Sequence, residues 1–215
     1  LSTALHLSRL GYSVAVLEAH RVGFGASGRN GGQLGAGQRV SQDELVSYLG
    51  EKHAHNLWLL AKDAVNTVKD IITTNKIDCH LKPGVATLGF NSREVNGLHQ
   101  YADYLEKKYN YDGLEKLDHK VCSAICGSEK YKGGILDMNA AHLHPLRFVF
   151  GLAKAAIQAG ADIFEKSEVR SLLPGKVNRT LTNSGEIQSE FVVLGCNGYL
   201  GNLEQKVAAK VMPIN

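Results

Sequence analysis

The chain has no long uninterrupted apolar run, and it has no secretory leader pattern of a basic stretch followed by an apolar core and a cleavage site. A membrane-spanning helix needs about 20 consecutive apolar residues, and no segment of this sequence approaches that length. We therefore expect a soluble, cytoplasmic protein with no membrane span.

The sequence also lacks an excess of one charge sign. Its 24 Lys and Arg residues and 21 Asp and Glu residues give a net charge of +3, and the two signs are interspersed along the chain. Such a weak field does not gather polyanions, so nucleic acid is not an expected partner. A hydrophobic content of 44% in 215 residues is enough to bury a core, which argues against disorder.

Cysteine is scarce, and its four positions do not form the framework of a small disulfide-rich domain. We expect free thiols, most of them buried. Two of the cysteines, Cys122 and Cys126, could share one face of a helix, but no further metal ligands accompany them.

The histidines do not indicate a metal site. His53 and His55 are two residues apart in a helical pattern, which places them on different faces, so we expect both at the surface. His142 and His144 alternate and could bind a metal from a strand edge, but stable zinc sites need three or four protein ligands and no third is near. No metal is therefore expected.

Both ends have the pattern of a chain cut from a longer one. The sequence opens directly in an apolar helical pattern, without Met and without a capping residue. At the other end, the segment 212–215 is typical of the beginning of an extended stretch whose continuation is absent. We expect sequence missing on both sides.

The opening segment follows the order of a dinucleotide-binding fold. A helix at 1–10 ends at Gly11, and a short apolar strand at 13–18 ends on Glu18. In such folds the acid after the second strand accepts hydrogen bonds from a ribose, and the glycine-rich turn after the first strand would precede Leu1. Glu18 fits that acid, although an apolar strand ending in a solvated carboxylate is common.

A glycine-rich segment follows at 22–37. Closely spaced glycines are unsuited to a helix interior or a packed strand, and they let a backbone approach a ligand closely. A flexible linker is the alternative. Phe24, Arg29 and Asn30 within the segment favour a shaped ligand-binding loop.

The remaining periodicities predict an α/β protein. Helices are expected at 43–75 with a break near Gly50, at 92–109 with Ser92 as the cap, and at 145–159. Strands are expected at 84–90, 134–138, 161–164, 168–172, 179–182 and 190–195, with a loop at 139–145. We expect an FAD/NAD(P)-binding, Rossmann-like domain at 1–80 and 145–215, incomplete here, with an inserted α+β substrate domain at 81–144.

Three segments resemble one known family. The segment at 14–32, which contains Glu-Ala-His-Arg-Val-Gly-Phe-Gly-Ala-Ser-Gly-Arg-Asn-Gly-Gly, is similar to the FAD-binding segment of the D-amino-acid-oxidase-like flavoproteins. Gly-Gly-Ile-Leu-Asp-Met-Asn-Ala-Ala-His-Leu-His-Pro-Leu at 133–146 and Asn-Gly-Tyr-Leu-Gly-Asn-Leu at 197–203 resemble the γ-glutamylputrescine oxidoreductase branch of that family. The chain departs from the family in lacking the phosphate-binding glycine motif that precedes the segment beginning at Leu1 in relatives.

The resemblance implies FAD as the cofactor and assigns residues to it. The implied contacts are Glu18 to the adenosine ribose; Gly25, Ala26 and Ser27 along the pyrophosphate and ribityl chain; Arg29, Asn30, Gly31 and Gly32 near the isoalloxazine; Val169 at the adenine; and Gly195, Cys196 and Asn197 in the turn that closes on the cofactor.

The chemistry that the resemblance implies is the oxidation of a γ-glutamylputrescine-like amine. Hydride passes from the amine-bearing carbon to flavin, water hydrolyses the imine to an aldehyde, and oxygen or another acceptor reoxidises the flavin. No residue stands out as a general base, so the catalytic residues are not assigned. The alternatives are an FAD dehydrogenase for glycine, sarcosine or a D-amino acid, and a truncated fragment without activity.

Overall fold

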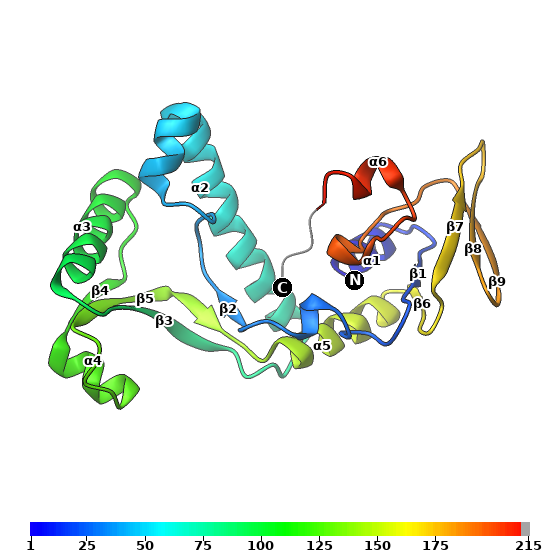
Figure 1. Cartoon of the computed structure of the whole chain (residues 1–215). Coiled ribbons are helices and arrows are strands. Elements are labelled where there is room, and N and C mark those ends of the chain that lie inside the picture. The colour runs from blue at the N-terminus through cyan, green and yellow to red at the C-terminus, as the bar shows by residue number, and fades with distance from the viewer. Residues whose placement is uncertain (212–215) are drawn as a thin grey trace. The chain divides into compact units, whose positions relative to one another are not determined.

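The computed structural model describes residues 1–211, and the expected extended segment at 212–215 lies outside them. The chain divides into two compact units (Figure 1). Unit 1 combines Leu1–Ser27 with Leu152–Asn215, and unit 2 is Gly28–Gly151. Helix α5 (Pro145–Gln158) contains the second boundary between them.

Unit 1 begins with the helix, turn and strand that the sequence predicts. Helix α1 (Ser2–Arg9) is followed by Gly11, whose φ of 87° is in the left-handed region that favours glycine. Strand β1 (Ala15–Leu17) then pairs in parallel with β6 (Asp162–Phe164). Parallel pairing joins segments far apart in the sequence, as the Rossmann-like prediction requires.

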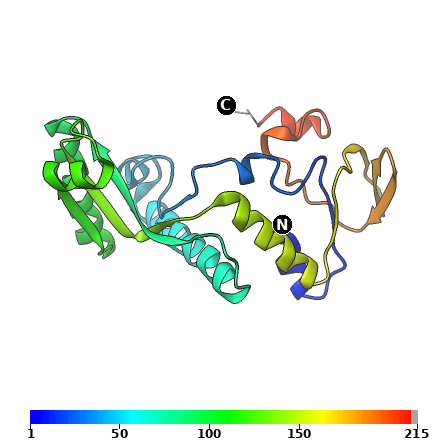
Figure 2. The ribbon, with the colours of Figure 1, turned by 90° about the horizontal axis from the view of Figure 1, so that it is seen from below.

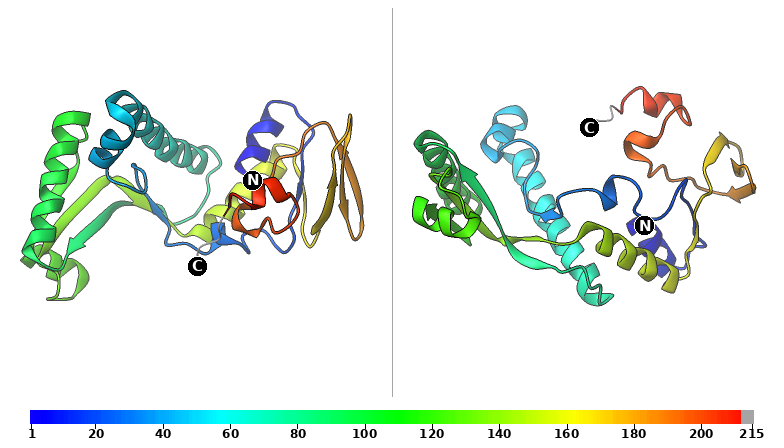
Figure 3. Two further views of the ribbon diagram at one scale, coloured as in Figure 1. Left: turned by 45° about the horizontal axis from the view of Figure 1, so that its top comes forward. Right: turned by 60° about the horizontal axis from the view of Figure 1, so that its bottom comes forward.

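A second sheet of unit 1 is a meander of three antiparallel strands, shown in yellow to orange in Figure 3. Its strands are β7 (Val169–Leu173), β8 (Asn178–Thr182) and β9 (Gly185–Ser189). After the meander come a short 3₁₀ turn, η2 (Asn197–Tyr199), and the short helix α6 (Gln205–Ala208).

The strand predicted at 190–195 is wrong. The strand in this region is β9, which ends at Ser189, and residues 191–196 have no regular structure. A strand needs a hydrogen-bonding partner, and none within residues 1–211 pairs with this segment. Its apolar side chains are exposed as a result, with Phe191 73% and Val193 65% accessible.

Unit 2 is built around one long strand, β5 (Gly133–His142) (Figure 2). It pairs antiparallel with three others, which are β2 (Gln33–Leu34), β3 (Lys82–Gly89) and β4 (Leu114–Asp118). The loop predicted at 139–145 is therefore wrong in part, because β5 continues to His142. Its last residues pair with Gln33–Leu34 on β2 and with Lys82 on β3, and a single-strand pattern does not reveal these partners.

The helices of unit 2 are α2 (Gln42–Thr74), α3 (Ser92–Tyr109) and α4 (His119–Cys126), with the first turns of α5. The predicted break in α2 is confirmed at Gly50, which has φ 77° and ψ 163°. The cap of α3 is Asn91 and not Ser92, because the Asn91 side chain accepts a hydrogen bond from Glu94 N at 3.0 Å. Strand β4 was not predicted from the sequence, and α4 was indicated only by the possible shared face of Cys122 and Cys126.

An aromatic cluster forms the core of unit 2. Trp58 of α2 packs with Leu105, Tyr109 and Tyr111, and all four are at most 8% exposed. Gln42 is buried at the edge of this cluster, where its Nε2 donates to Ala54 O at 2.6 Å and to Tyr109 Oη at 3.1 Å. This packing fixes the end of α3 against α2.

None of the helices in residues 1–211 combines the length and the apolarity needed to cross a bilayer.

Candidate cofactor site

Two carboxylates follow the parallel strand pair of unit 1. Glu18 comes directly after β1, and Glu165 comes directly after β6. Glu18 N donates to Phe164 O at 2.9 Å, which extends the ladder by one residue. Because parallel strands end at the same edge of a sheet, both acids lie at one edge, which is where α/β folds bind nucleotides.

Glu18 keeps one carboxylate oxygen available. Its Oε1 accepts a hydrogen bond from His20 N at 2.9 Å, which fixes the side chain against its own turn. Its Oε2 forms no hydrogen bond within the described part of the chain. A half-buried carboxylate with a free oxygen at this position can accept from a ribose hydroxyl.

The loop after Glu18 is shaped and not a flexible linker. Glu165 Oε1 accepts from Val22 N at 2.8 Å, and His20 O accepts from Lys166 N at 2.7 Å. The His20 and Phe24 rings lie 4.0 Å apart between centroids. These contacts fix the loop in front of the small residues Gly25, Ala26 and Ser27. The 3₁₀ turn η1 (Ala26–Gly28) begins at the end of the loop.

The segment around η2 approaches the same loop. A Cβ on Gly25 would lie 3.5 Å from the Tyr199 ring, so Gly25 and Tyr199 are in contact. Burial raises the pKa of the Cys196 thiol, and the Glu18 carboxylate raises it further, which places Cys196 within electrostatic reach of Glu18. Gly195 and Asn197 flank this cysteine, and Asn197 adopts a left-handed φ of 48°.

The predicted adenine position lies near this edge. Ser167 N donates to Glu18 O at 2.8 Å, and Val169, two residues later, begins β7. The predicted residues of unit 1 therefore come from three segments that meet around Glu18.

The remaining predicted residues belong to unit 2, and one of them has a structural role there. Gly32 N donates to Asn30 Oδ1 at 2.9 Å, and Leu143 N donates to Gly32 O at 2.9 Å. Gly32 has a φ of 72°, and a Cβ on it would lie 2.0 Å from Leu143 O. Only glycine fits here, whether or not a ligand binds. Arg29 and Gly31 lie in the same turn region of unit 2.

Two residues of this region, Glu165 and Tyr199, are not among the predicted site residues. Glu165 had a detectable signal, since it follows an apolar strand as Glu18 does. Tyr199 lies in the segment 197–203 that carries the resemblance, but its contact with Gly25 had no local signal, because the two residues are far apart in the sequence. Within residues 1–211, no group of three or more His, Cys, Asp or Glu residues is arranged to hold a metal ion.

The residues around Glu18 fit an adenine dinucleotide. A carboxylate oxygen is free at the carboxyl edge of a parallel pair, and small side chains follow it in a loop held by that edge. Bulky side chains in such a loop would block the approach of a diphosphate to the backbone.

Comparison with known proteins agrees with this geometry. The chain matches the DAO family, described as FAD dependent oxidoreductase, over residues 1–215. It is 36% identical to the probable oxidoreductase OrdL of Haemophilus influenzae, covering 100% of this chain and 51% of that protein. It is 33% identical to the gamma-glutamylputrescine oxidoreductase of Escherichia coli, covering 99% of this chain and 50% of that protein. The chain thus spans about half the length of these curated relatives.

Solved structures share the fold. Glycine oxidase from Geobacillus kaustophilus aligns with a TM-score of 0.73 at 20% identity, over 95% of this chain and 54% of that one. The L-amino acid deaminase from Proteus myxofaciens aligns with a TM-score of 0.72 at 18% identity, over 98% and 46%. The fold, the carboxylate edge and the match along the whole sequence agree, and the chain belongs to the DAO family of FAD-dependent oxidoreductases.

Proposed function

We propose that the full-length protein oxidises a small amine of the γ-glutamylputrescine type, with FAD as the oxidant. The observation that carries this proposal is the identity of 33% with gamma-glutamylputrescine oxidoreductase along 99% of the chain. The carboxylate edge in unit 1 supports the cofactor half of the proposal.

The proposed roles of the residues follow from their positions. Glu18 holds the adenosine ribose through its free Oε2, and Gly25, Ala26 and Ser27 line the path of the pyrophosphate and ribityl chain. Val169 meets the adenine, and the turn at 195–197 closes on the cofactor. Arg29, Asn30, Gly31 and Gly32 are assigned to the isoalloxazine end, where a guanidinium would stabilise negative charge on the ring.

FAD supplies the acceptor for the hydride in this reaction. The amine-bearing carbon gives up a hydride with two electrons and the amine gives up a proton, which leaves an imine. Water then adds to the imine, and an aldehyde and ammonia leave. With oxygen as the final acceptor, the two electrons and two protons end in hydrogen peroxide. The protein contributes orientation and a site from which water is excluded during hydride transfer.

An amino-acid substrate is the second candidate. The solved structures with this fold include glycine oxidase, an L-amino acid deaminase and L-proline dehydrogenase. Their identities to this chain are at most 20%, so they support the shared fold and leave glycine, sarcosine or a D-amino acid as the alternative substrate class.

The experiment is an anaerobic titration of the purified full-length flavoprotein. We expect γ-glutamylputrescine to bleach the flavin absorbance, and glycine, sarcosine and D-alanine to leave it unchanged. Admitting oxygen afterwards should restore the absorbance and release peroxide. Bleaching by one of the amino acids alone would replace the substrate with the second candidate, and a protein that binds no flavin would contradict the proposal altogether.

A further inference from the structure

The loop at 18–27 is joined to the turn at 165–167, which directly follows β6 in the same unit. Lys166 N donates to His20 O at 2.7 Å, one of the backbone hydrogen bonds between the two segments. Backbone bonds of this kind do not depend on which side chains the two segments carry.

Glu165 adds a side-chain contact to this joint. Its Oε1 accepts from Val22 N at 2.8 Å, and the two residues are 143 positions apart in the sequence. The acceptor is a carboxylate, and hydrogen bonds to an ionised acceptor are stronger than those between neutral groups. Because Glu165 is exposed, its removal leaves no cavity in the core of unit 1.

Val22 lies inside the turn that precedes the small residues at 25–27. Phe24 N closes this turn by donating to Arg21 O at 3.0 Å. The hydrogen bond from Val22 to Glu165 therefore restrains the turn as a whole. It fixes the point from which the backbone at 25–27 continues.

We propose that Glu165 is a positioning residue for FAD. Its carboxylate holds the turn at 21–24, so that the backbone at 25–27 is shaped for the cofactor before the cofactor binds. This inference rests on the proposed placement of the pyrophosphate and ribityl chain along 25–27. A loop that is already fixed in its bound conformation loses less conformational entropy on binding, which raises the affinity without a new contact to the ligand. Glu165 thus acts through Val22.

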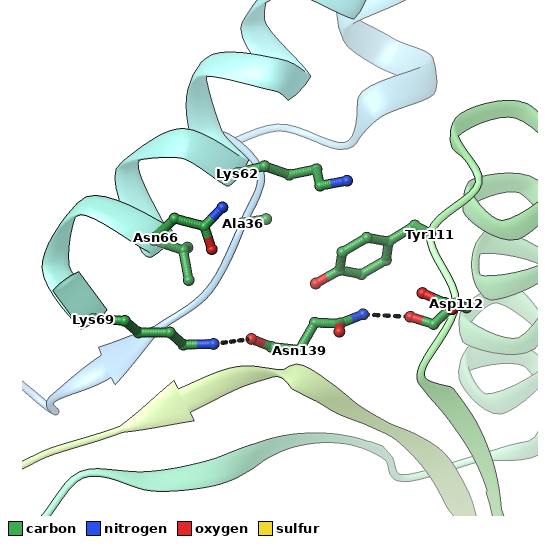
Figure 4. Close-up of a pocket in the computed structure, with 8 residues that line it drawn as sticks. Ala36, Lys62, Asn66, Lys69, Tyr111, Asp112 and Asn139 are labelled. Atoms are coloured by element: carbon green, nitrogen blue, oxygen red, sulfur yellow. Dashed lines mark hydrogen bonds between the residues drawn. The ribbon is translucent and has the colours of Figure 1, made fainter. Parts of the chain in front are cut away.

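Unit 2 contains a hydrogen bond of the same kind, which provides a matched control. Lys69 Nζ donates to Asn139 O at 2.8 Å across 70 positions of the sequence, and the Asn139 side chain donates to Asp112 O (Figure 4). Like the bond between Val22 and Glu165, the Lys69 bond joins a charged side chain to the backbone of a distant segment. None of the residues that line this recess is assigned to FAD.

The test is a fluorescence titration of FAD into the FAD-free, full-length protein and its variants. Glu165→Ala should weaken FAD binding about tenfold, because the turn must then be ordered when FAD binds. Glu165→Gln keeps an oxygen for Val22 N and should bind FAD as the wild type does. Lys69→Met and Glu190→Ala, which removes an exposed acid of unit 1, should leave the affinity unchanged.

Hydrogen exchange of the FAD-free protein separates positioning from a general loss of stability. The Val22 amide should exchange faster in Glu165→Ala than in the wild type, because its acceptor is gone. The amides of the β1–β6 ladder should keep their exchange rates, and the variant should keep the unfolding temperature of the wild type, because backbone bonds form that ladder.

Equal FAD affinities of Glu165→Ala and Glu190→Ala would overturn the proposal. So would unchanged exchange at Val22, or a Glu165→Gln variant that binds FAD as weakly as Glu165→Ala, because the amide oxygen can still accept from Val22 N. The titration contains no amine, so its result does not depend on the substrate of the proposed oxidation. A wild-type protein that binds no FAD would overturn the proposed function and this inference together.

Discussion

The two units differ in how their strands find partners. In unit 2 every strand pairs antiparallel with β5, and all these partners lie between residues 28 and 151. In unit 1, β1 and β6 form a parallel pair of three residues each, and their register joins Ala15 to Asp162 across the entire sequence of unit 2. Unit 2 thus builds its central sheet within one continuous segment of the chain, while the parallel pair of unit 1 joins segments that lie on either side of that segment in the sequence.

The two units also differ in how completely they bury their apolar side chains. Unit 2 buries an aromatic cluster around Trp58, whereas unit 1 leaves the apolar side chains at 191–194 exposed in the described structure. Glu18, which we propose holds the adenosine ribose of FAD, also lies in unit 1. We therefore expect packing to dominate the stability of unit 2, and bound cofactor to contribute more to unit 1, because a ligand that binds only the folded state stabilises it.

The largest effect is expected from removing the centre of the aromatic cluster. Trp58→Ala should destabilise the protein by about 3–5 kcal/mol, because it leaves a cavity among Leu105, Tyr109 and Tyr111. Trp58→Phe should cost less, since Trp58 Nε1 is buried without a hydrogen-bond partner. Urea unfolding measures both, and Tyr48→Ala on the exposed face of α2 is the control, with an expected change within about 0.5 kcal/mol. A small effect of Trp58→Ala would contradict a packing-dominated unit 2.

Next in size is the close backbone contact of Gly32. Gly32→Ala places a Cβ at 2.0 Å from Leu143 O, so β2 must shift away from its partner. We expect a loss of about 3 kcal/mol or more in the free energy of unfolding. Gly37 also has a positive φ, but a Cβ added there would have no other atom within 4 Å. Gly37→Ala should therefore lower the free energy of unfolding by only about 1 kcal/mol. Equal costs would show that backbone conformation, and not the contact, requires glycine at 32.

A smaller, cofactor-specific effect is expected in unit 1. Glu18→Gln keeps an oxygen for His20 N but removes the charge that strengthens a hydrogen bond from ribose. We expect FAD to bind about tenfold more weakly, which corresponds to about 1.4 kcal/mol, with unchanged unfolding of the FAD-free protein. Fluorescence titration measures the affinity. Glu190→Gln, an exposed acid of the same unit, should leave it unchanged.

The smallest effect concerns the reactivity of Cys196. Burial and the Glu18 carboxylate both raise the pKa of this thiol from its ordinary value, so the reactive thiolate should form only at higher pH than in a free cysteine. Mass spectrometry can follow the rate of iodoacetamide alkylation of Cys196 in the FAD-free protein as a function of pH. The midpoint of that pH profile reports the pKa of the thiol. Glu18→Gln removes the negative charge and should lower that midpoint. An unchanged midpoint would show that the Glu18 carboxylate does not influence the Cys196 thiol.

The sequence predicted the elements whose signals are local. The helix at 1–10, the break at Gly50 and the helix that begins at Pro145 each depend on apolar spacing with a glycine or proline nearby, and the structure confirms them. The acid that ends β1 was also visible, because an apolar strand followed by a carboxylate is readable within a few residues.

The errors lie where distant pairing decides the structure. The last residues of β5 look like a loop in isolation, and they form a strand because Gln33 and Lys82 both pair with His142. Residues 190–195 have the composition of a buried strand but find no partner within residues 1–211. The contact of Tyr199 with Gly25 could not be predicted for the same reason. The resemblance supplied the cofactor, which no local pattern in this chain establishes alone.

The most direct test of this account is hydrogen exchange of the full-length protein with and without FAD. We expect FAD to slow exchange of backbone amides at 18–27, 167–170 and 195–199, and to leave α3 at 92–109 unchanged. Protection at these three segments of unit 1 would support the nucleotide site at the carboxyl edge of β1 and β6. Exchange that FAD leaves unchanged at 18–27 would contradict it.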